Sequence, residues 1–405
     1  MAFVAQPMRI LMKPTQRPAA QLSIALLAAT VLSSPAFAET VKVGVLQSLS
    51  GTMAISEVTV KNAEMMAIDE INAAGGVLGK QIEPIVEDGA SDPAIFAQKA
   101  TKLVQDNGVV TVFGGWTSAS RKAMLPVFQK LKSLLWYPVQ FEGNECSPAI
   151  MYSGAQPNQQ IVPAYDWGKT KGYKSFFLVG SDYVFPRTAN LILKKHIALD
   201  KLTTAGEEYV PLGGSDFSAV IAKIQAAKPD VIYSTLNGDS NVSFFKQMSA
   251  AGIKLPVMSF SIGEQEAQAM GASLVEGSYA GWNYFQSIDT PANKKFVADY
   301  QTKFGAGAAV TDPMVHGYVD VYAWKAAVEK AGAFDVDKVR KAAVGLELAT
   351  PMGAVKFAPN QSLYQKAYVG ELDSKGQFKI LWESKDVIPP DPYDPVAFPG
   401  KKCEL

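Results

Sequence analysis

The sequence predicts an α/β protein built from two doubly wound lobes. Short β-rich runs alternate with helical segments in two separate series along the chain. Such alternation is typical of parallel sheets that are covered by helices and joined by right-handed crossovers. With 405 residues, 48% of them hydrophobic, the chain is long enough to form more than one core.

The N-terminal segment does not share this pattern. Residues 1–38 contain three basic side chains and no acidic one, and an apolar stretch from Leu22 to Leu32 precedes the sequence Ala36-Phe37-Ala38. A stretch of 11 residues is too short to cross a bilayer. A buried N-terminal helix is the alternative, but this order of features is typical of a secretory signal peptide. We therefore predict cleavage after Ala38.

The first series contains apolar or β-rich runs separated by segments with apolar residues at helical spacing. Gly75 and Gly76 end the first helix. Pro84 indicates an edge strand, and Pro93 suits the first helical position. The expected strands are 41–46, 81–86, 109–114 and 134–139, and the expected helices are 56–74, 93–106 and 118–131.

A second series begins near residue 160 and ends in a different pattern. Its expected strands are 175–180, 208–212, 230–236 and 256–260, with helices at 186–199, 217–227 and 240–251. Two helices, 292–304 and 312–331, and an antiparallel hairpin of 368–372 with 378–382 complete the pattern. We assign residues 39–157 and 284–352 to lobe 1, 158–283 and 353–385 to lobe 2, and 386–405 to a C-terminal tail packed on lobe 1.

Charge and composition exclude several kinds of function. The chain has 38 basic and 38 acidic residues, so removing the three basic residues of the leader leaves 35 against 38, a net charge of −3. This balance gives no basic surface for nucleic acid. Two His and two Cys cannot form a Cys/His zinc cluster, although a carboxylate cation site stays possible. We expect no metal and no cofactor.

The two cysteines are Cys146 and Cys403. In an exported protein an isolated pair is most simply a disulfide, and two unrelated thiols are the alternative. The bridge would fasten the tail, whose many prolines prevent a helix and favour an extended course.

Enzyme motifs are weak in this sequence. The glycine-rich segment 72–81 follows a helix and has Gln81 where a phosphate loop needs Ser or Thr, and no G-x-S-x-G elbow is present. We interpret His196 as part of a solvated helix face and His316 as a structural residue at a helix end. A hydrolase with two carboxylates is left open by counting alone.

The expected strand exits carry the candidate binding residues. In open α/β sheets ligands bind beyond the carboxyl ends of the strands. Aromatic rings there would supply flat walls, Gln, Tyr and Ser would supply donors and acceptors, and the helix start at Ser118 would supply free N–H groups. Core packing is the alternative for the Trp and Tyr side chains, and helix capping for Asp182 and Asp239. The candidates are Trp116, Ser118, Tyr137, Gln140, Phe141, Asp182, Tyr183, Asn237 and Ser261.

Several stretches resemble one family. VKVGVLQSLSGTMA followed by AIDEINAAGGVLGKQIEPIVED resembles the periplasmic substrate-binding proteins of branched-chain amino-acid and amide ABC transporters. GGWTSASRKAMLP, LLWYPVQFEGNECSP, GAQPNQQ, GSDYVFPR and IPPDPYDP are similar to the urea-binding subgroup, which itself is similar to cytoplasmic short-chain amide sensors. The sequence departs from the subgroup at Phe141, where Tyr is usual, and at Gly263, where Ala is expected.

The resemblance implies a type I periplasmic binding protein with a three-segment hinge, the Venus flytrap fold, that closes on its ligand and delivers it to a membrane permease. It places Trp116, Ser118, Tyr137, Gln140, Phe141 and Tyr183 on ligand-contact segments. We therefore predict a monomeric, non-enzymatic periplasmic receptor for a small neutral ligand, urea or a short amide, without nucleic acid as a partner.

Three other interpretations stay open. The ligand could be a branched-chain amino acid, whose ammonium group would need a carboxylate such as Glu142, Asp182, Asp239 or Glu264. The chain could also be an exported hydrolase, or a cytoplasmic amide sensor, although the leader argues against the latter.

Overall fold

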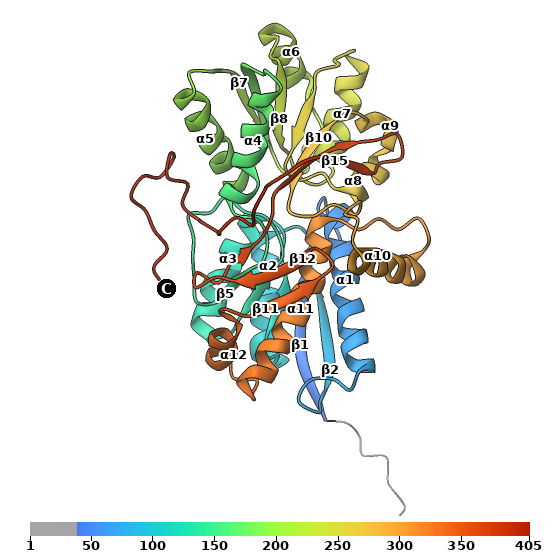
Figure 1. Cartoon of the computed structure of the whole chain (residues 1–405), viewed down its shortest axis with the longest axis vertical. Helices are drawn as coiled ribbons and strands as arrows, with labels where there is room; N and C mark the ends of the chain where they lie inside the picture. Colours follow the sequence, from blue (N-terminus) through green and yellow to red (C-terminus); the bar gives the residue numbers. More distant parts are fainter. Residues whose placement is uncertain (1–38) are drawn as a thin grey trace, which may run out of the picture. The chain divides into compact units, whose positions relative to one another are not determined.

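The computed structural model describes residues 39–405, in which two sheets are each covered by helices (Figure 1). The predicted signal peptide, residues 1–38, lies outside the described residues. None of the helices between residues 39 and 405 combines the length and apolar character that spanning a bilayer requires.

The first sheet is parallel throughout, with strand order β2-β1-β3-β4-β5. Pro84 lies in the edge strand β2, as predicted. An edge strand tolerates a residue without an N–H group, because one side of the strand has no neighbouring strand to accept a hydrogen bond. Helix α1 packs against α11 (Asp312–Ala331), which comes much later in the chain, and α2 packs against α3. The strands are β1 (Thr40–Gln47), β2 (Gln81–Asp88), β3 (Val112–Gly114), β4 (Leu135–Tyr137) and β5 (Ile150–Tyr152). The first helices are α1 (Ala54–Ala73), α2 (Pro93–Thr101), continued by a π-helical turn (Lys102–Asp106), and α3 (Ser118–Leu131).

The second sheet has the order β15-β14-β10-β9-β8-β6-β7. Strands β6 to β10 run parallel, whereas β14 pairs antiparallel with β10 and forms the predicted hairpin with β15. Strand β7 begins earlier than expected because residues from Thr203 onward pair with β6. The strands are β6 (Ser175–Ser181), β7 (Thr203–Val210), β8 (Val231–Thr235), β9 (Val257–Ser259), β10 (Tyr279–Trp282), β14 (Tyr368–Leu372) and β15 (Phe378–Glu383).

Helices cover both faces of this second sheet. Apolar residues of α4 and α5 form one buried cluster with β6 and β8, and those of α6 and α7 form another with the same sheet. Apolar runs in the central strands are thus explained by burial on both faces. The helices are α4 (Ile161–Thr170), preceded by a 3₁₀ turn (Pro157–Gln159), α5 (Val184–Leu199), α6 (Ser218–Ala227), α7 (Ser240–Ala250), α8 (Glu264–Met270) and α9 (Ala272–Val275).

The chain then returns to the first core and stays there longer than expected. We assigned residues 353–385 to lobe 2, but Val355, Phe357 and Leu363 are buried in the core of lobe 1. The Phe357 ring meets the edge of Trp136 with 5.7 Å between ring centroids. Only β14 and β15 of that range join the second sheet. The returning elements are α10 (Pro291–Phe304), α11 (Asp312–Ala331), α12 (Val336–Ala343) and a small sheet of β11 (Glu347–Thr350), β12 (Gly353–Phe357) and β13 (Leu363–Tyr364).

A buried polar network joins the segments that cross between the sheets. The Asn283 side chain donates to the Gln159 carbonyl at 3.0 Å and to the Lys366 carbonyl at 2.6 Å. His316 of α11 contacts the backbone carbonyl of Asp312 through Nδ1 at 2.8 Å and Gln365 through Nε2 at 2.9 Å. His316 thus connects α11 with one of the segments that cross between the sheets.

The C-terminal tail, which we expected to pack on lobe 1, contacts both lobes. Cys146 and Cys403 form the predicted disulfide, with 5.9 Å between their Cα atoms. The Asn144 N–H donates to the Pro392 carbonyl at 2.7 Å in lobe 1. In lobe 2, His196 of α5 contacts Asp394 at 2.9 Å, so His196 is not on a purely solvated helix face.

Candidate ligand-binding site

The strand exits of the two sheets meet each other, as the candidate site requires. Trp116, which follows β3, donates from Nε1 to Asn237 Oδ1 after β8 at 3.2 Å. Gln140, which follows β4, donates from Nε2 to the carbonyl of Phe260 after β9 at 2.8 Å. These four side chains are each no more than 3% exposed. The two lobes are thus in direct contact at these strand exits.

A strained turn brings β3 into α3 at this point. Gly114 has φ +130°, and a Cβ atom on it would lie 2.1 Å from the Leu46 carbonyl oxygen, so glycine is required there. Thr117 caps α3 by accepting from the Ser120 N–H at 3.1 Å. Among the described residues, no acceptor is found for the N–H groups of Ser118 and Ala119. These two groups are available donors at a helix N-terminus.

The polar side chains of the first lobe have their donors occupied by protein partners. Tyr137 donates its O–H to the Trp116 carbonyl, and Ser118 donates its O–H to Glu142. Gln140 donates to Phe260 as described above, and its Oε1 is buried without a hydrogen-bond partner in the described chain. The Phe260 carbonyl fixes the orientation of this amide, because a flipped amide would oppose two oxygens. What these side chains still offer is acceptor oxygens.

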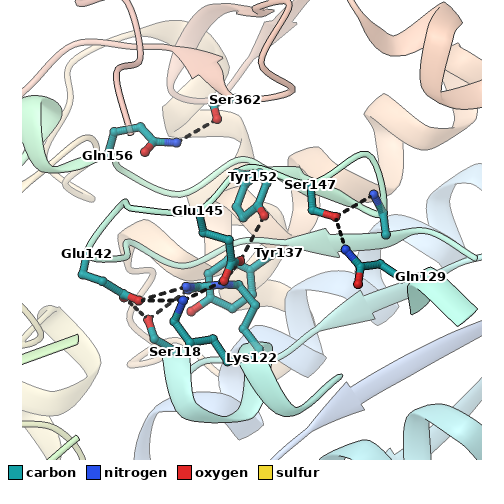
Figure 2. Close-up of polar contacts among 12 residues, drawn as sticks. Ser118, Lys122, Gln129, Tyr137, Glu142, Glu145, Ser147, Tyr152, Gln156 and Ser362 are labelled. Carbon is teal, nitrogen blue, oxygen red and sulfur yellow. Dashed lines mark hydrogen bonds and ion pairs between the residues drawn. The ribbon is translucent and has the colours of Figure 1, made fainter. Parts of the chain in front are cut away.

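Ser118 contacts an ion cluster formed by Arg121, Lys122, Glu142 and Glu145 (Figure 2). Arg121 is completely buried and donates to Ser118 Oγ at 2.9 Å, to Glu142 at 3.1 Å and to Glu145 at 2.8 Å. Lys122 contacts Glu145 at 2.8 Å. Two cations therefore face two carboxylates. Burial alone would raise the pKa of Glu145, but Arg121 and Lys122 lower it to about 2.

Aromatic rings enclose the Arg121 guanidinium. Its central carbon lies 5.0 Å from the Tyr137 ring centroid and 4.5 Å from that of Phe141. Phe141 also stacks on Tyr152, with 4.9 Å between centroids. The structure thus places Phe141, a candidate contact, in the packing around the ion cluster.

The second-lobe candidates differ in position. Tyr183 comes directly before α5. Its pKa is raised first by burial and then by Tyr137 of the other lobe. Ser261 donates to the Leu236 carbonyl and so joins two strand exits within lobe 2. Asp182 is exposed and pairs with Arg187 at 2.6 Å instead of facing the other candidates. Neither Asp182 nor Asp239 forms a side-chain cap.

Two features of this site were not identified from the sequence. Arg121 was treated as one position of an ordinary helix, although the acidic pair Glu142 and Glu145 in the loop after β4 was a signal that a buried cation would be needed. Glu57, near the start of α1, accepts from the Ser48 N–H, and burial raises its pKa to about 8. Within residues 39–405 no three His, Cys, Asp or Glu side chains are grouped so that they could hold a metal ion.

Comparisons with known proteins give consistent relatives. The profile of a family described as "Periplasmic binding protein domain" matches residues 41–398. The chain is 26% identical over 370 residues to Leu/Ile/Val-binding protein homolog 6 of Brucella melitensis, covering 86% of this chain and 92% of the relative. It is 25% identical over 356 residues to the leucine-, isoleucine-, valine-, threonine-, and alanine-binding protein of Pseudomonas aeruginosa, covering 85% and 92%.

Solved structures share the fold. A solute-binding protein of an R. palustris ABC transporter, in complex with benzoate, superimposes with a TM-score of 0.78 at 20% identity, covering 90% of this chain and all of that one. A branched-chain amino acid transporter substrate-binding protein from Streptococcus pneumoniae, in complex with isoleucine, gives 0.74 at 20% identity, covering 87% and 100%.

Proposed function

This chain belongs to the periplasmic binding protein family and is a substrate-binding protein of an ABC transporter, and from this premise we propose that its ligand is urea or a closely similar short amide. As in its relatives, the protein is a receptor and not an enzyme. It works in the periplasm and presents its ligand to a membrane permease. The proposed part is the identity of the ligand.

The pattern of free donors and acceptors carries the proposal. Urea is planar and neutral, with four N–H donors and one carbonyl acceptor. Gln140 Oε1, buried without a partner, and the remaining lone pairs of Ser118 and Tyr137 would accept from such a ligand. The N–H groups of Ser118 and Ala119 would donate to its carbonyl oxygen. Trp116 and Tyr183 would lie against its two faces.

The charges near the site also favour a neutral ligand. An amino acid needs an unpaired carboxylate for its ammonium group. Of the four carboxylates considered from the sequence, Glu142 is paired with Arg121, and Asp182 is paired at the surface. Asp239 is exposed, and burial raises the pKa of Glu264 and that of Glu57 to about 8, which disfavours the charged carboxylate that an ammonium group needs. A carboxylate ligand such as benzoate would lack a free cation, because Arg121 already contacts two glutamates.

A branched-chain amino acid is the second candidate. It is favoured by two relatives. The Pseudomonas protein is named for binding leucine, isoleucine, valine, threonine and alanine, and the Brucella protein is named as a homolog of a Leu/Ile/Val-binding protein.

Calorimetric titration of the mature protein decides between these candidates. Urea, acetamide, leucine and benzoate would each be added at low millimolar concentration, well below denaturing levels of urea. Saturable binding of urea, or of acetamide, without leucine binding supports the proposal. Binding of leucine without binding of urea or acetamide overturns it. Thermal unfolding with each ligand gives an independent measure, since a ligand bound to the folded state raises the unfolding midpoint.

A further inference from the structure

We propose that Glu142, acting with Arg121 on the hydroxyl of Ser118, is the positioning residue that makes this site accept neutral N–H donors and reject carboxylates. The inference deepens the proposed function and rests on it. Neither Glu142 nor Arg121 is offered as a ligand contact. Their role is to fix what Ser118 can present to a ligand.

The geometry around Ser118 leaves its hydroxyl little freedom. Its O–H donates to Glu142 Oε2, and its oxygen accepts from Arg121 Nη1 at 2.9 Å. A hydroxyl has one donor and two acceptor sites. Glu142 therefore uses the O–H donor of Ser118, and Arg121 uses one of the two lone pairs on the Ser118 oxygen. One lone pair of this oxygen stays available to a ligand. All three side chains are no more than 1% exposed, and water cannot compete for these contacts.

The same carboxylate also shields the cation. Glu142 Oε1 contacts Arg121 Nη2 at 3.1 Å, on the side of the guanidinium next to Ser118. Glu145 contacts the Nε of Arg121 at 2.8 Å and the O–H of Tyr152 at 3.0 Å, and it makes no contact with Ser118. Figure 2 shows Glu142 beside Ser118, with Glu145 turned toward Tyr152. Loss of the Glu142 carboxylate would thus free the hydroxyl donor of Ser118 and leave the positive charge of Arg121 less compensated, and both changes favour a carboxylate ligand.

The two glutamates offer a matched pair of variants. Glu142→Gln and Glu145→Gln remove the same charge from the cluster of Arg121 and Lys122, but only the first changes the group that faces Ser118. The glutamine amide has a single acceptor oxygen, and when that oxygen stays on Arg121 its NH2 group faces Ser118 and cannot accept the hydroxyl proton. Urea and acetate binding would be measured by calorimetry on both variants and on the wild type. We expect Glu142→Gln to weaken urea binding at least tenfold and to gain saturable acetate binding. Glu145→Gln should keep its urea affinity within about threefold and should still reject acetate.

Two results would overturn the inference. One is a folded Glu142→Gln variant with wild-type urea affinity and no acetate binding. The other is an equal change in both variants, which would indicate an effect of net charge or of general packing. If the wild-type protein binds neither urea nor acetamide, the proposed ligand is wrong, and the gain of acetate binding in Glu142→Gln alone still tests the positioning role.

A double variant covers the case in which Glu142→Gln fails to fold because Arg121 is left partly uncompensated. Arg121→Gln with Glu142→Gln removes both charges together. We expect this protein to bind urea weakly, since Ser118 is no longer oriented, and to reject acetate, since no additional cation is released. Wild-type urea affinity in the double variant would contradict the positioning role.

Discussion

Replacing Gln140 with leucine tests the site at its most specific atom. Gln140 is 3% exposed, its Nε2 bonds to the Phe260 carbonyl of the opposite lobe at 2.8 Å, and its Oε1 is buried without a partner. In the free protein the substitution removes one hydrogen bond and also removes an unsatisfied acceptor. These two effects oppose each other, so we expect little change in the unfolding midpoint.

Ligand binding should respond much more strongly. Leucine leaves one N–H of the ligand without a partner, and a buried unsatisfied group costs about 1–3 kcal/mol. The Phe260 carbonyl keeps a donor in Gln160 at 3.3 Å, so it adds little to this loss. We expect a loss of roughly 2 kcal/mol, which corresponds to a Kd weakened about 30-fold. Calorimetric titration with urea measures this loss directly.

Gln156→Leu provides a matched control. Gln156 is also fully buried, with Nε2 bonded to Ser362 at 2.7 Å and Oε1 without a partner in the described chain. Figure 2 shows this pair away from Ser118 and Glu142. Urea affinity should stay within about threefold of the wild type in the control. Unchanged affinity in Gln140→Leu, or an equal loss in both variants, would refute the assignment of Gln140 Oε1 as a ligand acceptor.

Three further predictions concern the lobes, the tail and pH. Trp116→Phe keeps an aromatic ring but removes the 3.2 Å bond to Asn237, so urea binding should weaken about 3- to 10-fold in calorimetry, while the smaller ring in this buried position also lowers the unfolding midpoint; unchanged urea affinity would assign Trp116 to packing alone. Cys403→Ser opens a disulfide that spans 257 residues, and guanidinium unfolding should show a loss of about 3–5 kcal/mol that reductant reproduces in the wild type; identical midpoints would show that the bridge adds no stability. Burial alone would lower the pKa of His316, but Asp312 raises it to about 9, and burial raises the pKa of Asp320 to about 8. Both folded-state values exceed the ordinary ones, so the folded protein holds protons that the unfolded chain releases, and this stabilisation is lost as pH rises through 8 to 9. The guanidinium midpoint should therefore fall between pH 6 and pH 9, and His316→Gln should reduce the fall; a midpoint that rises over this range would contradict the assignment.

The succession of elements was predictable because it depends on local pattern. Pro84 indicated an edge strand, Pro93 and Asp92 indicated a helix start, and the hairpin after residue 368 was evident from its turn residues. Asp92 indeed caps α2 by accepting from the N–H groups of Ala94 and Ile95. Such features need no knowledge of distant contacts.

Placement of the later segments was less predictable. Residues 353–364 look like ordinary short strands, and nothing local shows which core Val355 and Phe357 enter. The position of the C-terminal tail was also only partly predictable. Cys403 indicated the disulfide to Cys146 in lobe 1. The contact of Asp394 with His196 in lobe 2 depends on how the two lobes are arranged, which no local pattern shows.

For the site, the strand exits by themselves indicated Trp116, Gln140 and Asn237, because parallel strands with the same direction bring their carboxyl ends to one edge. The sequence determined this edge, the exported class of protein and the cysteine pair. Only the tertiary structure decided which hydrogen-bond donors remain free, and that Arg121 is a buried partner of Glu142 and not a surface residue. The reason is physical: a local pattern fixes which face of an element is apolar, whereas the state of a hydroxyl or a charge depends on partners brought together from distant parts of the chain.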